Sequence, residues 1–207
     1  MATKRWVWVA AMVVATLAGT AMAVEEPAFT QVLREGDFEL RDYPALVAAE
    51  ATVAGDQKEA ANKGFRLLAG YIFGANKRRQ KIAMTAPVAQ QAASEKIAMT
   101  APVAQSQTAA GTWVVRFIMP KAYSLQTLPV PDDARVSLRN IEPARFAVLR
   151  FSGLAQSGDV QTRSNELLVR VQSHRLRSIG PVTLAQYNPP WTLWFMRRNE
   201  VMVEVAR

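Results

Sequence analysis

The segment GDFELRDYPALVAAEATVAGD, residues 36–56, alternates between apolar and polar side chains before Pro44 and continues after it as a mostly apolar run. Alternation with a period of two is typical of strands that bury one face. Gly36-Asp37 is typical of a tight turn, and a proline interrupts the hydrogen bonding of a strand. The segment therefore predicts two strands, 38–43 and 45–53, the first of which forms a hairpin with the residues before the turn.

A helix is expected directly after these strands. Asp56 can cap its N-terminus, and Gly74 is typical of the position where a helix stops, here near Phe73. Between these residues, apolar side chains recur at helical spacing: Ala61, Phe65, Leu68 and Ile72.

The second half of the chain repeats this order. Apolar and β-branched runs predict strands, and Gly180-Pro181 is expected beyond the end of a helix. The predicted strands are 113–119, 136–141, 146–151, 182–187 and 200–205, and the predicted helix is 160–176. The pattern predicts one internally duplicated α+β domain, with two helices packed on an antiparallel or mixed sheet.

The first 23 residues resemble an export signal. Lys4-Arg5 precedes an apolar run over 6–19, and Ala21 and Ala23 stand at the small-residue positions of a cleavage site. The run is shorter than the roughly 20 residues that span a bilayer. We expect cleavage after Ala23, which leaves 24–207 as a single domain of net charge +6 instead of +8. The expected location is the bacterial periplasm, without stable membrane insertion; the alternative is an uncleaved anchor.

Composition excludes several kinds of site. The chain has no Cys and a single His, His174, so disulfides, thiolate metal sites, covalently attached haem and cysteine nucleophiles are excluded. A hydrolase lacks support because no nucleophile-elbow pattern is present. Asp132-Asp133 lies in a Pro-rich segment typical of a surface connection. A nucleic-acid partner is not expected, because the basic residues are dispersed.

A ten-residue repeat is prominent in the middle of the chain. KIAMTAPVAQ occurs at 81–90 and again at 96–105. The two copies predict either a pair of core strands or a methionine-bearing surface suited to a flat ligand. Both interpretations remain open on sequence alone.

Several motifs, ordered along the chain, closely resemble the SOUL family of haem-binding proteins. They are FELRDYP (38–44), both copies of KIAMTAPV, FIMP (117–120), ARFAV (144–148), FSG (151–153), YNPPW (187–191) and RRNEV (197–201). The resemblance extends from Phe29 to Val205. It implies two pseudo-symmetric halves that form a distorted β-barrel flanked by two helices, an architecture similar to that of bacterial effector-binding domains.

The resemblance also implies a function. Family members bind haem or other tetrapyrroles non-covalently in a shallow apolar cleft, so the expected cofactor is haem b or another porphyrin, for transport, storage or scavenging rather than catalysis. The residues that match the helix wall of this cleft are Asn62, Phe65, Arg66 and Ala69. Those that match its loop wall are Tyr187, Asn188, Pro189, Pro190, Trp191 and Thr192.

A porphyrin needs apolar walls and a few cations for its carboxylates. Phe65 and Trp191 are the expected walls, and some of the aromatic residues Trp191, Trp194 and Phe195 are expected to face the core. The expected cations are Arg66, Lys63, Lys77, Arg78 and Arg79.

His174 is the candidate iron ligand from composition, and Met84, Met99, Tyr71 and Tyr187 are further candidates. His174 lies near a predicted helix end, which favours its cationic form, whereas an iron ligand must be neutral. We therefore expect weak or absent axial coordination. Two alternatives remain: a binding module for another flat amphipathic molecule, and an enzyme that modifies a tetrapyrrole.

Overall fold

The structure is a computed structural model that describes residues 24–78, 94–109 and 111–207. The first half contains β1 (Thr30–Glu35), β2 (Phe38–Tyr43), β3 (Leu46–Ala54), α1 (Gln57–Ile72), β4 (Asn76–Lys77), β5 (Val103–Ala109) and β6 (Thr112–Ile118). The second half contains β7 (Val130–Pro131), β8 (Val136–Ile141), β9 (Ala144–Ser152), α2 (Ser157–Ser173), β10 (Ser178–Gln186), the short 3-10 helix η1 (Trp194–Met196) and β11 (Arg198–Val205).

Nine strands form one antiparallel sheet, in the order β1-β2-β9-β11-β10-β5-β6-β3-β8. The chain turns at Pro44, so that β2 pairs with β9 while β3 pairs with β6 and β8. The second half makes the same exchange at Pro143, between β8 and β9. The first half therefore supplies the hairpin β1-β2 to the second, the second half supplies β8 to the first, and the pairing of β5 with β10 joins them at the centre. The predicted α+β class, with two helices packed on an antiparallel sheet, is confirmed.

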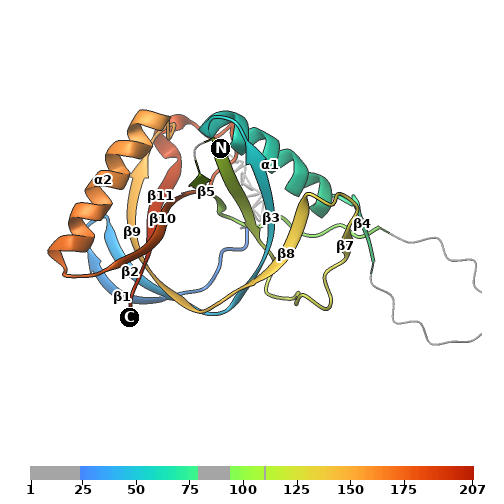
Figure 1. Ribbon diagram of the computed structural model, residues 1–207, viewed down its shortest axis with the longest axis horizontal. Helices are drawn as coiled ribbons and strands as arrows, with labels where there is room; N and C mark the ends of the chain where they lie inside the picture. Colours follow the sequence, from blue (N-terminus) through green and yellow to red (C-terminus); the bar gives the residue numbers. More distant parts are fainter. Residues whose placement is uncertain (1–23, 79–93, 110) are drawn as a thin grey trace, which may run out of the picture.

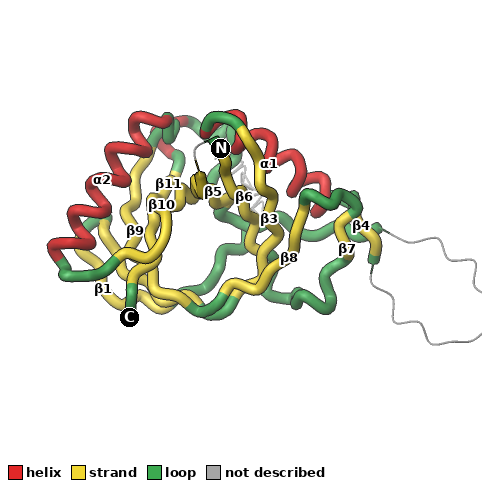
Figure 2. Tube along the Cα trace, in the orientation of Figure 1, coloured by secondary structure: helices red, strands yellow, loops and turns green. Residues whose placement is uncertain are grey.

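The sheet is curled but open. Figure 1 and Figure 2 show the strands curving around an interior, with both helices on the outer side of the curve. Strands β1 and β8 are the two ends of the sheet, and no pairing between them is found within the described residues. The closed barrel expected from the family resemblance is therefore not confirmed.

Helix α1 begins where it was predicted. Asp56 caps it, and its Oδ1 accepts a hydrogen bond from the Glu59 backbone at 2.8 Å. The buried face is partly different from the predicted one, because Ala60 and Gly64 face the sheet in place of Ala61 and Phe65. The physical reason is close approach: a glycine lets the helix axis lie nearer to β6 than a larger side chain would allow.

Helix α2 and the connection after it differ from the prediction. The helix covers Ser157–Ser173, with His174 as its C-cap. The chain then turns at Arg175, whose φ of 56° places it in the left-handed region usually taken by glycine. Gly180 and Pro181 lie inside β10, where the pairing with β11 shifts register between Ile179 and Thr183. A bulge thus accommodates the two residues, which lie beyond the end of the helix as expected but inside a strand.

The second copy of the repeat is not a strand over most of its length. Residues 96–102 are irregular, and β5 begins at Val103. Ile97 is buried beneath α1, in a cluster that includes Leu68 and Phe117. The first copy, 81–90, lies outside the described residues. For residues 96–102 of the second copy, the prediction of a core strand is wrong.

Two apolar clusters hold the helices on the sheet. The cluster beneath α1 joins Leu68 and Tyr71 to Val115 of β6, and the cluster beneath α2 joins Leu167 and Val171 to β9, β10 and β11. The opposite, concave face of the sheet carries most of the charged side chains of the strands.

Replacing Gly64 with Ala should destabilise the protein by about 1–3 kcal/mol, because a Cβ there would lie 2.4 Å from Val115 Cγ2. Chemical unfolding in urea measures the change. The control is Gly70→Ala in the same helix, where the nearest atom is 4.0 Å away and helix propensity alone should stabilise by up to about 1 kcal/mol. Equal effects of the two substitutions would contradict this packing.

Asp42 of β2 should stabilise the fold in a pH-dependent way. Its carboxylate accepts two hydrogen bonds from Arg145 of β9, at 2.8 and 2.7 Å, and this pairing holds its pKa below the ordinary value of 3.8. Such a group stabilises the fold fully above its ordinary pKa, and the contribution is lost as pH falls through the lowered value. Asp42→Asn should therefore lower the free energy of unfolding by about 1 kcal/mol at pH 7. The difference between parent and variant should disappear as the pH falls below about 4. Urea unfolding at several pH values measures this difference, and a difference that stays constant down to strongly acidic pH would contradict the stabilising role of Asp42.

Candidate functional site

The loop between β10 and β11 is held by its own hydrogen bonds. Arg197 donates Nε to the Thr192 carbonyl at 2.8 Å and its Nη2 to the Pro190 carbonyl. Asn188 Oδ1 accepts from the Arg198 backbone at 2.6 Å. These bonds fix the loop, residues 187–197, in one shape although most of it is exposed.

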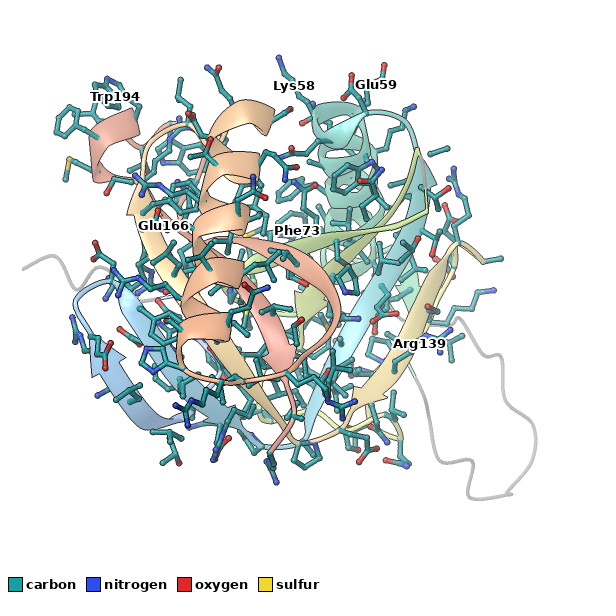
Figure 3. The ribbon with its side chains drawn as sticks, turned by 60° about the vertical axis from the view of Figure 1, so that its left-hand side comes forward. Lys58, Glu59, Phe73, Arg139, Glu166 and Trp194 are labelled. Carbon is teal, nitrogen blue, oxygen red and sulfur yellow. The ribbon has the colours of Figure 1, made fainter. Side chains whose placement is uncertain are left out.

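Large apolar side chains of this loop point into solvent. Their exposed fractions range from 56% for Phe195 to 82% for Trp191, and the set comprises Trp191, Leu193, Trp194, Phe195 and Met196. Figure 3 shows Trp194 projecting from the edge of the molecule. The expectation that some of the three aromatic residues face the core is wrong, since all three are exposed. We call this set the aromatic loop patch. Exposed apolar patches of this kind mark binding surfaces.

Tyr187, at the start of the loop, lies on the concave face of the sheet, opposite the helices. Its hydroxyl donates to Glu200 Oε2 at 2.6 Å, and the Arg198 guanidinium lies 3.6 Å from its ring centre. Burial raises the pKa of Tyr187 strongly, and the negative charge of Glu200 adds to the increase. Tyr187 therefore stays protonated and anchors the base of the loop.

Glu200 is at the centre of a buried ion network. Arg41 of β2 reaches across β9 and donates Nη1 and Nη2 to Glu200, at 2.8 and 3.0 Å. It also donates Nε to Glu39 at 2.7 Å. All three residues are almost fully buried. Burial alone would lower the pKa of Arg41, but the hydrogen bonds and charge of Glu200 raise it above its ordinary value, so the guanidinium remains charged.

A narrow cavity of about 80 Å³ lies beside this network on the concave face. Its lining is mainly apolar and includes the aromatic side chains of Tyr43, Phe146 and Tyr187. Phe29, from the segment that leads into β1, covers both Tyr43, at a ring distance of 5.4 Å, and the Arg41 guanidinium, at 4.4 Å. The N-terminal residues of the described chain thus close over the network.

The helix wall expected from the family is only partly available. Asn62 and Arg66 are exposed and Ala69 is buried. Phe65 is 38% exposed and packs edge-on against Phe117, with ring centres 5.5 Å apart.

Strand register relates this wall to the loop. Phe117 of β6 pairs with Val103 of β5, which pairs with Gln186 at the end of β10. Two strand spacings of nearly 5 Å place the start of the loop about 10 Å from the strand beneath Phe65. Figure 3 shows Trp194, farther along the loop, well apart from Lys58, Glu59 and Phe73 around α1. None of the five cavities that we characterise is lined by both walls.

Most of the expected cations are already engaged. Lys77 lies 4.0 Å from Asp132, and Arg78 lies 3.0 Å from Glu95. Lys63 contacts Glu59 and the Ala54 carbonyl. Arg66 donates Nε to the Asn62 carbonyl, and no carboxylate pairs with it within the described chain. Arg79 lies outside the described residues, so Arg66 is the cation best placed for an anionic ligand beside Phe65.

His174 lies at the C-terminus of α2. Its ring stacks on Phe38 with centres 4.9 Å apart, and Nε2 lies 3.2 Å from Glu35 Oε2. These contacts give His174 a structural role at the C-terminal end of α2.

The other candidate iron ligands are also engaged or outside the description. Tyr71 is buried and donates to the Pro129 carbonyl at 3.0 Å. Met99 packs against the cluster beneath α1, and Met84 lies outside the described residues. No group of three or more His, Asp or Glu side chains suited to a metal occurs among the residues that the structure describes.

Comparison with known proteins identifies the family. A model of the SOUL heme-binding protein family matches residues 24–204. The chain belongs to the SOUL family. This SOUL chain is 26% identical to heme-binding protein 2 of Mus musculus over 183 residues, which cover 82% of each chain.

Solved structures with the same fold are more distant in sequence. The C-terminal domain of EcmrR has a TM-score of 0.57 at 10% identity and covers 82% of the SOUL chain and 97% of its own. A hydrolase from Listeria innocua has a TM-score of 0.54 at 13% identity, with coverages of 82% and 92%. These similarities establish the fold alone. In the described part of the SOUL chain, no helix has the length and apolar character needed to cross a membrane.

Sequence reasoning missed the ion network. Glu39, Arg41 and Glu200 occupy the polar positions of alternating strands, which suggest a solvent-facing side. One sequence signal could have predicted the network: β2 and β11 carry opposite charges, Arg41 and Glu200, at positions that alternate with apolar residues.

Removing Arg41 should destabilise the fold severely. Arg41→Met leaves two buried carboxylates without their main partner and should lower the free energy of unfolding by about 3–5 kcal/mol, measured in urea. Arg34→Met is the matched control, because Arg34 is exposed and lies 3.7 Å from the same Glu39; its cost should stay below about 1 kcal/mol. Similar costs for both variants would contradict the network.

Proposed function

We propose that this SOUL protein binds haem, or another porphyrin, non-covalently at the aromatic loop patch. The observation that carries the proposal is the exposure of five large apolar side chains on one ordered loop. A porphyrin has broad apolar faces, and covering such a patch removes its surface from water. Because the loop is held by Arg197 and Asn188, little ordering is needed on binding.

The ligand extends from the patch toward α1. Phe65 supplies a second apolar surface, and Arg66 meets a carboxylate of the porphyrin rim with its planar guanidinium. Asn62 and the residues 188–192 complete the contact surface. Tyr187 positions the loop through Glu200 without touching the ligand, which revises its role from wall to anchor.

Axial coordination is not needed for this binding. Iron, when bound, would supply the redox and spectroscopic properties of haem. The protein supplies shape, apolar contact and charge, so iron-free protoporphyrin should bind with similar affinity. We place the protein outside the cytoplasm, after cleavage following Ala23, where it carries, stores or scavenges the porphyrin without modifying it.

Titration with hemin should give a saturable Soret change and quenching of tryptophan fluorescence. The double variant Trp191→Ser, Trp194→Ser should bind at least tenfold more weakly, because each indole buries apolar surface against the macrocycle. Its stability should change little, since both side chains are exposed in the free protein. Val169→Ala, on the exposed face of α2, is the control and should bind like the parent.

The outcome that would overturn the proposal is equal affinity of the double variant and the Val169 control. His174→Ala should leave the Soret spectrum unchanged, because its imidazole is engaged by Phe38 and Glu35. Loss of iron or appearance of a ring-opened pigment during incubation would instead indicate an enzyme.

A further inference from the structure

The two helices leave the centre of the outer face uncovered. Helix α1 packs on β3 and β6, whereas α2 packs on β9, β10 and β11. Figure 1 shows the helices converging from opposite sides, with β5 and β10 between them. A groove of about 620 Å³ lies there, bordered by the N-terminal turns of both helices, and its volume is that of a small-molecule site. We call it the interhelix groove.

Uncharged polar side chains make up much of the lining of this groove. Five carboxamides from three elements, α1, β5 and α2, meet there: Gln57, Gln105, Gln107, Gln161 and Asn165. No Lys or Arg is among the described residues that line it. The single carboxylate, Asp56, is occupied as the cap of α1.

Gln105 is the least expected of these residues. It lies on the helix-facing side of β5, between Leu184 of β10 and Val115 of β6, which are both core residues. The residue is 5% exposed, and its Oε1 has no hydrogen-bond partner among the residues that the structure describes. A buried amide without a partner is costly, and an apolar residue would suit this central strand better. A polar group of a ligand bound in the groove would supply the hydrogen bond that the Gln105 amide lacks.

The walls also offer a rigid apolar surface. Trp113 is fixed by a hydrogen bond from Nε1 to the Gly55 carbonyl, at 3.1 Å. Val160 and Leu168 of α2 and Val182 of β10 lie along the same groove. The groove thus combines an aromatic and aliphatic surface with a row of amides.

We propose that the interhelix groove binds a neutral saccharide. Each carboxamide has both donors and acceptors, which match hydroxyl groups that also donate and accept. The carbon-bound hydrogens of a sugar ring suit the surface of Trp113. An anionic ligand would find no cation, and a purely apolar ligand would strip water from five amides without replacing its hydrogen bonds.

The test is NMR titration of the 15N-labelled protein with two neutral disaccharides, N,N′-diacetylchitobiose and maltose. At least one should shift the side-chain signals of Gln105, Gln161 and Trp113 in a saturable way, while the indole signals of Trp191 and Trp194 stay fixed. No saturable shift with either disaccharide would overturn the proposal. The loop signals separate this result from the porphyrin proposal.

Variants assign the binding to the groove. Gln161→Leu, at an exposed position of α2, and Gln105→Leu should each weaken binding about tenfold, the value of one or two lost hydrogen bonds. Gln172→Leu is the matched control on α2 outside the groove and should bind like the parent. If Gln105→Leu fails to fold, the affinity of Gln161→Leu alone tests whether the disaccharide binds in the groove. Unchanged affinity of Gln161→Leu, or stronger binding of uridine to the same signals, would overturn the saccharide assignment.

Discussion

The bond on which the rest of the structure depends is the buried pair of Arg41 and Glu200. It connects β2, at one end of the fold, to β11 across the intervening β9. Two carboxylates and a guanidinium are removed from water together, and this is tolerable only because the bidentate geometry and Tyr187 satisfy their hydrogen bonds. The strand exchange between the halves is what brings Arg41 within reach of Glu200.

This constraint separates the two faces of the sheet by function. The outer face is apolar beneath α1 and α2, and the concave face holds the charges. Tyr187 is fixed from the concave side by its hydrogen bond to Glu200, whereas the aromatic residues of the loop that follows it are exposed.

Much of the fold could be predicted from the sequence. Alternation predicted β2, apolar and β-branched runs predicted β3 and β8, and Asp56 marked the start of α1, because these signals are local. The end of α2 was misplaced because the chain already turns at Arg175, a non-glycine residue in the left-handed conformation that lies before Gly180. Gly64 and the Arg41 network escaped prediction because their roles depend on neighbours distant in sequence. For the site, the family resemblance named the loop, but only the structure separates exposed Trp191 from anchoring Tyr187.

The most direct test of the account is to map bound hemin by paramagnetic broadening, with zinc protoporphyrin as the diamagnetic reference. The account predicts the strongest broadening at the indole signals of Trp191 and Trp194, at the backbone of residues 188–196 and at Phe65, with the ring signals of Tyr43 and Phe146 little affected. Broadening centred instead on Tyr43 and Phe146 in the concave cavity, or on Gln105 in the interhelix groove, would contradict it.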